Sequence, residues 1–213
     1  MKSQDIVLLL KLVCMQKNEE SGSEAFRNAW PHDWQDWALG GNPKELDKWD
    51  ADNTDTPATA PYSARALEES TGISKSQINL SLNRCLDVGL ARMDRRFAVP
   101  RANSKALFEF IVYGLKYVFP AKAGEVTRGI GTSFSAPILK NKLLSAGEFQ
   151  LVWPDASGKT MGLTIEPLFK SVAYAVKLDG QLYECMALVD AIRLGQPRES
   201  NLAATMLKEI LGV

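Results

Sequence analysis

The chain has 213 residues, of which 46% are hydrophobic, and its 25 basic residues balance 25 acidic ones. This composition is typical of a folded protein with one good hydrophobic core or two modest ones. A formal net charge of zero, with a pI of about 6.6, argues against a protein that coats nucleic acid without selectivity.

An apolar segment near the N-terminus predicts a buried helix over residues 4–17. Nine of the ten residues from 6 to 15 are apolar, but Lys11 interrupts them, and a membrane-spanning helix needs ~20 residues. A signal peptide is disfavoured because Asp5 occupies the region that would be basic and no small-residue cleavage site follows. We therefore expect a cytoplasmic protein with no membrane segment.

Residues 18–61 interrupt this pattern with an acidic segment. Between residues 18 and 60, ten acidic residues face three basic ones, a net charge of −7, yet the segment holds four of the five tryptophans, namely Trp30, Trp34, Trp37 and Trp49. We interpret it as an insertion that its tryptophans pin to its own domain or to a dimer partner. The alternative is a partner-docking or regulatory segment.

Two helices joined by a tight turn are predicted over residues 63–88. The first covers residues 63–70, Thr71-Gly72-Ile73 form the turn, and the second begins at Ser74 and ends at Val88. The spacing of Ser74 and Gln77 is that of a capping box, in which each side chain bonds the backbone of the other residue. Gly72 and Gly89 suit left-handed positions, which end helices. The spacing fits a helix-turn-helix motif.

The second helix and the segment after it form a candidate surface for double-stranded DNA. Ile78, Leu82, Cys85 and Leu86 recur at helical spacing and predict the buried face. A hairpin is expected after it, with strands 90–93 and 97–99. Residues 71–101 carry six cations (Lys75, Arg84, Arg92, Arg95, Arg96, Arg101) and two acids (Asp87, Asp94), a net charge of +4.

Polar and cationic side chains of this kind suit a groove of base edges lined by phosphates. We assign base contacts to Lys75, Ser76, Asn79 and Asn83, and phosphate or minor-groove contacts to Arg84, Arg92, Arg95 and Arg96. Ser74 and Gln77 complete the predicted DNA-binding set, with Gln77 divided between capping and contact.

Residues 104–213 predict a small α+β unit. Ser104 is expected to cap a helix over residues 105–114, and two helices are expected to close the chain, over residues 182–194 and 198–211. Between them, short segments bounded by Gly and Pro predict strands over residues 116–119, 149–153 and 162–166.

A glycine-rich segment in this unit, residues 127–133, has two interpretations. Its glycines and hydroxyls suit an ordinary structural loop. They would also suit an anion or effector site, built from Thr127, Arg128, Gly129, Gly131, Thr132 and Ser133. Isothermal titration calorimetry with nucleotides distinguishes the two, because the absence of a heat of binding would rule out the effector site.

Residues 131–137 resemble the serine-bearing loop of subtilisin-like proteases, in which Ser133 would be the nucleophile. His32 is the only histidine of the chain, and its surroundings do not match that family's histidine motif. A serine nucleophile needs such a base, and paired carboxylates for acid–base work are also lacking, so we predict no enzymatic activity. We expect no metal and no cofactor, and we interpret the three cysteines as buried thiols.

Several blocks together resemble bacterial winged helix-turn-helix regulators of the MarR-like class, including a group with a C-terminal extension. These blocks are residues 4–12, 62–67, 72–76, 118–120, 127–130 and 187–193. The resemblance implies a dimer, with residues 74–84 in the major groove and the wing near the minor groove. The insertion at 18–61 departs from the compact link that such proteins have between their first two helices.

The sequence thus predicts a mainly helical α+β protein with two domains. Residues 1–103 would form a winged helix-turn-helix domain, and residues 104–213 a domain for dimerisation or sensing. The predicted function is that of a homodimeric, sequence-specific transcriptional regulator. The rival prediction is an antitoxin-like or complex-assembly protein that uses the winged helix as a scaffold and binds a protein partner through residues 18–61 or the C-terminal domain.

Overall fold

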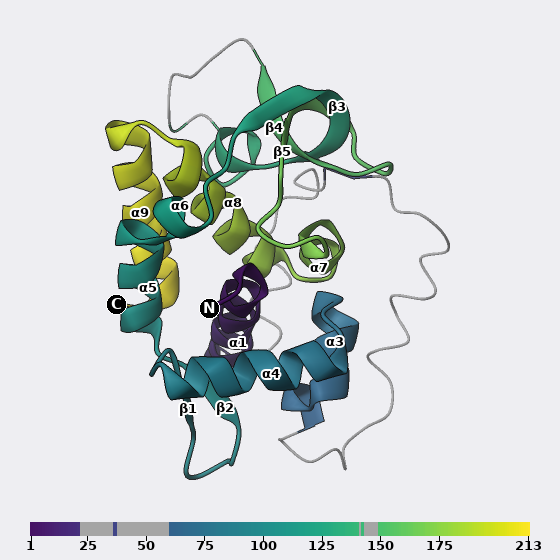
Figure 1. The fold of residues 1–213 in the computed structure, drawn as a ribbon. Coiled ribbons are helices and arrows are strands. Elements are labelled where there is room, and N and C mark those ends of the chain that lie inside the picture. Colours follow the sequence, from purple (N-terminus) through teal and green to yellow (C-terminus); the bar gives the residue numbers. More distant parts are fainter. Residues whose placement is uncertain (22–35, 38–59, 141, 143–148) are drawn as a thin grey trace.

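A buried helix, α1 (Ser3–Ser21), runs through the middle of the computed structural model, which describes residues 1–21, 36–37, 60–140, 142 and 149–213 (Figure 1). Every residue from Ile6 to Leu10, and also Leu12, is fully buried. A helix that is apolar all round is a core element rather than a surface one. The prediction of a buried first helix is confirmed.

Below α1 in Figure 1 lie the elements of residues 60–102. They are η3 (Ala60–Tyr62), α3 (Ala64–Thr71), α4 (Lys75–Asp87) and the antiparallel strands β1 (Ala91–Met93) and β2 (Pro100–Ala102). Both helices lie within a residue of their predicted bounds. Ser63 caps α3, its hydroxyl accepting the N–H of Ala66 at 3.2 Å.

The remaining elements lie beside and above α1. The helices are α5 (Ser104–Tyr113), α6 (Leu115–Val118), α7 (Val172–Leu178), α8 (Gly180–Leu194) and α9 (Pro197–Leu211). The strands are β3 (Ala123–Gly131), β4 (Gln150–Pro154) and β5 (Thr160–Ile165), with η4 (Ser133–Ser135) after β3. The protein is therefore α+β and mainly helical, as predicted.

The three long strands close into a small barrel. Strand β3 pairs antiparallel with both β4 and β5, and β4 pairs parallel with β5. Each strand thus pairs with both of the others.

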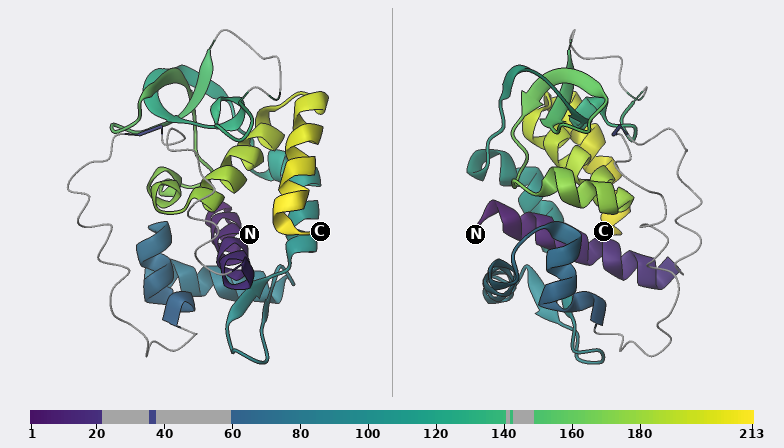
Figure 2. Two further views of the ribbon diagram at one scale, coloured as in Figure 1. Left: turned by 180° about the vertical axis from the view of Figure 1, so that it is seen from behind. Right: turned by 90° about the vertical axis from the view of Figure 1, so that its right-hand side faces the viewer.

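Both halves of the described chain contribute to one hydrophobic core. Figure 2 shows α1 passing between them. Lys11 of α1 forms an ion pair with Asp179, the residue before α8, at 2.8 Å. Near α7, the Ser171 hydroxyl donates to the carbonyl oxygen of Thr71 at 2.6 Å, and the Tyr174 hydroxyl donates to that of Glu69 at 2.8 Å. These two hydrogen bonds hold helix α3 against the C-terminal half of the chain.

Several predictions for the C-terminal half are wrong in detail. Residues 115–118 form a helix rather than a strand, because Leu115 and Phe119 lie four residues apart and both pack on the core. Strand β3 and helix α7 were not predicted. Helix α5 is capped by Asn103 rather than by Ser104, since the Asn103 side chain accepts the N–H of Ala106. None of the described helices is long and apolar enough to cross a membrane.

Candidate nucleic-acid interface

The turn between α3 and α4 depends on Gly72. Its φ of 66° is left-handed, and its N–H bonds the carbonyl oxygen of Glu68 to end α3. A side chain at this position would also place its Cβ 2.9 Å from the Cβ of Ser171. Glycine is therefore required both by the backbone conformation and by the close approach of the C-terminal half.

The start of α4 is as predicted, but the predicted capping box is wrong. Ser74 precedes the helix in an extended conformation and makes no side-chain capping bond. The side chain of Gln77 does not reach back to Ser74, because its carbonyl oxygen accepts a hydrogen bond from the Gln4 amide of α1 at 3.0 Å. A tertiary contact has replaced the local one.

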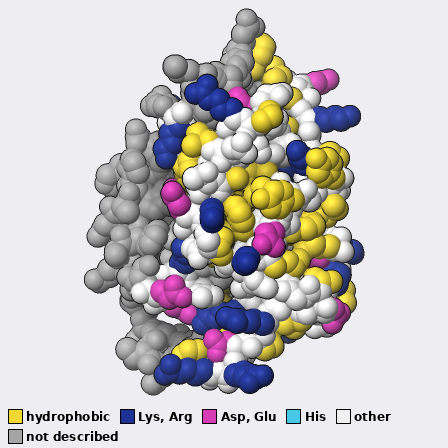
Figure 3. Space-filling view, turned by 90° about the vertical axis from the view of Figure 1, so that its left-hand side faces the viewer, with side chains coloured by type: hydrophobic (Ala, Val, Ile, Leu, Met, Phe, Trp, Pro, Cys, Tyr) yellow, Lys and Arg dark blue, Asp and Glu magenta, His cyan; other side chains and the backbone are white. Residues whose placement is uncertain are grey.

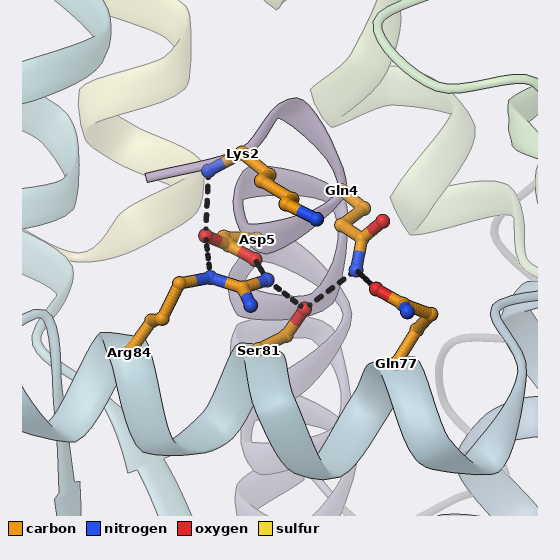
Figure 4. A network of polar contacts seen from close by, with 6 residues as sticks. All are labelled: Lys2, Gln4, Asp5, Gln77, Ser81 and Arg84. Atoms are coloured by element: carbon orange, nitrogen blue, oxygen red, sulfur yellow. Dashed lines mark hydrogen bonds and ion pairs between the residues drawn. The ribbon is translucent and has the colours of Figure 1, made fainter.

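The buried face of α4 is partly polar. Ile78 and Cys85 are buried as predicted, and Ser81 between them is fully buried. The Ser81 hydroxyl accepts from Gln4 at 3.0 Å and from Arg84 at 2.9 Å. Figure 4 shows how these side chains join the first turn of α1 to the middle of α4. The network sets the position of α4 on the core.

Arg84 is part of this network rather than of the free surface. Its Nε and Nη2 donate to the two carboxylate oxygens of Asp5 at 3.0 and 2.5 Å (Figure 4). Burial raises the pKa of Asp5, but the bonds from Arg84, from the Lys2 backbone and from Ser81 outweigh it and hold that pKa below its usual value. The guanidinium of Arg84 thus neutralises a buried carboxylate, and its contact with a DNA phosphate stays a prediction.

The opposite face of α4 is exposed and has no partner among the described residues. Lys75, Ser76, Asn79 and Asn83 all lie there, without a hydrogen bond or ion pair to any described side chain. Leu80 shares this face with 51% of its surface exposed. The sequence interpretation overlooked Leu80, although its position off the buried stripe of Ile78 and Cys85 was a usable signal.

The hairpin after α4 forms with a later second strand than predicted. Arg92 of β1 pairs with Arg101 of β2, so residues 97–99 belong to the turn and not to a strand. The Asp94 carboxylate causes this longer turn, because it accepts the backbone N–H groups of Arg96 and Phe97 at 2.7 and 3.2 Å. These backbone bonds lower the pKa of Asp94.

Four of the six cations counted in this region remain on the surface. Arg84 is paired with Asp5, and Arg101 is buried against Tyr62 and bonded to Glu19 at 2.7 Å. The exposed cations are Lys75 at the start of α4 and Arg92, Arg95 and Arg96 on the hairpin. The structure therefore brings together one exposed helix face and one basic hairpin.

The glycine-rich segment 127–133 is not the predicted loop. Residues 127–131 belong to β3, and a Cβ at Gly129 would lie 2.0 Å from the carbonyl oxygen of Trp153. Gly129 therefore serves the close packing of the barrel. The interpretation of this segment as an effector loop loses its geometric basis.

Two hydroxyl side chains of this segment, those of Thr132 and Ser133, are also buried. Thr132 donates to the carboxylate of Asp190 at 2.9 Å, and that carboxylate also accepts from Trp153 and Arg193. Ser133 is fully buried. Thr127 and Arg128, the other predicted members, lie on β3, with Arg128 exposed.

Between residues 22 and 59 of the acidic insertion, the structure describes Asp36 and Trp37 alone. Trp37 is buried and packs edge-on against Tyr183 of α8, with ring centroids 5.8 Å apart. The Asp36 carboxylate accepts from the Gly131 N–H at 2.6 Å and from the Thr160 hydroxyl at 2.7 Å. Trp37 was expected to pin the insertion to its own domain or to a dimer partner, but it packs instead on the predicted C-terminal domain. The other three tryptophans and His32 lie outside the described residues.

Comparisons of the chain with protein-family models, with curated proteins and with solved structures gave no match. Among the residues that the structure describes, no three His, Cys, Asp or Glu side chains gather in a way that could hold a metal ion. All three cysteines are buried and free, as predicted.

Proposed function

We propose that this protein is a cytoplasmic regulator that binds double-stranded DNA through a winged helix-turn-helix. Helix α4 would be the recognition helix in the major groove, and the β1–β2 hairpin the wing beside the minor groove. The observation that carries the proposal is the exposed polar face of α4, next to a hairpin with three exposed arginines.

The chemistry of this surface supports DNA more than a protein partner. Asn79 and Asn83 have side-chain amides that bond no described residue and that suit the paired donor and acceptor of an adenine edge. Lys75, Arg92 and Arg95 are exposed and form no ion pair with a described residue, so they could neutralise phosphates on either side of such a contact. The single acid of the hairpin, Asp94, turns its carboxylate to the backbone of its own turn.

An unbiased selection tests the proposal. Purified full-length protein is incubated with a random pool of duplex DNA, and the retained molecules are sequenced. We expect one enriched motif and binding that weakens steeply as salt rises. Absence of both enrichment and retention at low salt would overturn the proposal.

We also propose that the protein is a homodimer through the groove between α5 and α9. The groove has a volume of about 620 Å³ and is lined by Lys105, Phe108, Glu109, Tyr113, Lys208 and Val213. In Figure 3, which views the side with α5 and α9, hydrophobic side chains gather in a band with both signs of charge among them. A two-fold interface brings one patch against its own copy, so Glu109 of one subunit would face a lysine of the other.

The oligomeric state in solution tests the homodimer. Sedimentation should give a dimer for the wild type and a monomer for Tyr113→Glu, since Tyr113 is 72% exposed at this groove. Val126→Glu, which changes an exposed residue of β3, should remain dimeric. A monomeric wild type, or one monomer bound to a different protein at this groove, would overturn the homodimer and favour the assembly-protein alternative.

A further inference from the structure

Phe97 is an exposed aromatic side chain at the tip of the basic hairpin. It is 42% exposed and lies between Arg96 and the left-handed Ala98. Isolated exposed apolar residues are common on proteins, so exposure alone assigns no role. The construction of the turn around Phe97 supplies the argument.

The turn holds Phe97 in a fixed position. Asp94 accepts the N–H of Phe97 through its carboxylate and that of Ala98 through its carbonyl oxygen at 2.9 Å. Asp94 in turn donates its own N–H to Val99 at 2.8 Å. Ala98 adopts a φ of 52°, a costly conformation for a residue with a Cβ, and such strain is concentrated at functional sites.

The tip combines an aromatic ring with positive charge. The guanidinium of Arg96 lies 5.0 Å from the centroid of the Phe97 ring, and Arg95 is exposed beside it. Figures 1 and 2 show the hairpin extending beyond the other described elements. Arginine side chains are attracted by the negative potential of a narrow minor groove, and an apolar ring beside them can insert between base pairs.

We infer that Phe97 is a wedge that enters the minor groove between two base pairs and bends the DNA. This inference rests on the proposed function, because it needs the hairpin to lie on a duplex. Pyrimidine–purine steps unstack most easily, so the protein should prefer a TA step under the wing. The bend should fall within the ~20–90° typical of such wedges.

The experiment measures binding and bending separately on one probe. The probe is a duplex of about 30 base pairs that carries the selected motif, with a fluorophore at each end and 2-aminopurine at the step under the wing. Anisotropy reports binding, energy transfer between the ends reports bending, and 2-aminopurine fluorescence reports unstacking. Wild-type protein should raise both the energy transfer and the 2-aminopurine fluorescence.

Three variants assign the effect to the ring. Phe97→Ala should still bind, with affinity lowered by less than about tenfold, but should abolish the bending and unstacking signals. Phe97→Leu keeps an apolar wedge and should retain both signals in part. Val126→Ala, at an exposed apolar position of β3, should behave as wild type.

The outcomes separate the wedge from the proposed function. Binding of a duplex that stays straight, or a Phe97→Ala variant that bends DNA like wild type, would overturn the wedge and leave DNA binding intact. Failure of the wild type to bind any duplex would overturn both. A third outcome would be that wild-type protein does not bend DNA but binds vesicles of anionic lipid, and that Phe97→Ala loses this binding. It would assign the tip to a membrane surface and overturn the wedge.

Discussion

Arg84 of α4 and Asp5 of α1, which are 79 residues apart in the chain, form a two-point ion pair. The side chain of Asp5 is fully buried, whereas that of Arg84 is 28% exposed. The pair therefore fixes α4, the proposed recognition helix, to the first turn of α1. Because Ser81 and Gln4 join the same network, the position of α4 depends on polar as well as apolar contacts.

Removal of Arg84 should destabilise the protein. Arg84→Ala leaves a buried carboxylate without its counter-charge, which costs ~3–5 kcal/mol in a fully buried pair. We expect about 2 kcal/mol here, because solvent reaches part of Arg84. Urea unfolding measures the change, and Arg65→Ala, which breaks the exposed pair with Glu69, should cost less than about 0.5 kcal/mol.

The same pair can be checked for coupling. The double variant Asp5→Asn with Arg84→Ala should lose less stability than the two single variants together, because the uncompensated charge is removed. An Arg84→Ala variant as stable as Arg65→Ala would contradict the role given to this pair.

The two left-handed glycines that flank α4 should differ in their tolerance of a side chain. Gly72 and Gly89 have φ of 66° and 74°, but a Cβ at Gly72 would meet Ser171, whereas one at Gly89 has open space around it. Gly89→Ala should cost about 1 kcal/mol from backbone strain alone. Gly72→Ala should cost at least about 2 kcal/mol, and equal losses in urea unfolding would contradict the close approach of α7.

Local signals explain why helices α3 and α4 and the turn between them were predictable. Gly72 and Gly89 mark helix ends through their own conformational freedom, and Ile78 and Cys85 mark a buried face through their spacing. None of these signals depends on the rest of the chain. The candidate base-contacting residues follow from the same spacing, because they lie off this buried face and are polar.

Long-range contacts explain what was not predictable. The sequence around Arg84 gives no sign that Asp5 will neutralise it, so a free cation was assumed. Strand β3 was interpreted as a loop because its glycines are typical of turns, whereas a closed barrel uses Gly129 to bring two strands together. In both cases the decisive partner is distant in sequence.

Glu184 of α8 should make the stability depend on pH. Burial raises the pKa of Glu184 to about 7, although Lys142 lowers it in part. Because the pKa of Glu184 is higher in the folded than in the unfolded protein, its contribution to the free energy of unfolding is fully present below about pH 4 and is lost as the pH rises toward 7. Above pH 7 the loss is constant.

The variant Glu184→Gln tests this dependence. It should match wild type at pH 4 and exceed it by about 2 kcal/mol at pH 8, after allowance for partial exposure to solvent. Thermal or urea unfolding at the two pH values measures the difference. The control is Glu209→Gln, at an exposed position of α9. Its stability should differ from that of wild type by the same amount at pH 4 and at pH 8.

Asn79 should determine specificity at one base pair. Its side chain is exposed in the middle of the free face of α4 and is bonded to no described residue. Asn79→Ala should weaken binding to the selected motif by about 1–3 kcal/mol and relax the preference at a single position. Binding to duplexes with each base replaced in turn measures this, with Asn201→Ala of α9 as the control. If Asn79→Ala discriminates between bases as well as wild type does, Asn79 does not contact a base.

The arginines of the hairpin should instead control affinity on every sequence. The side chain of Arg95 has no partner among the described residues, and that of Arg96 contacts only the Phe97 ring among them, so both can neutralise phosphates. Each lost phosphate contact should reduce the slope of log affinity against log salt by about one unit. Arg95→Ala should therefore bind all duplexes more weakly at low salt while the order of preference stays the same. Arg198→Ala, at an exposed position near the start of α9, should keep the wild-type slope. If Arg95→Ala and Arg96→Ala both keep the wild-type slope, the hairpin does not contact the DNA backbone, and the proposed wing loses its support.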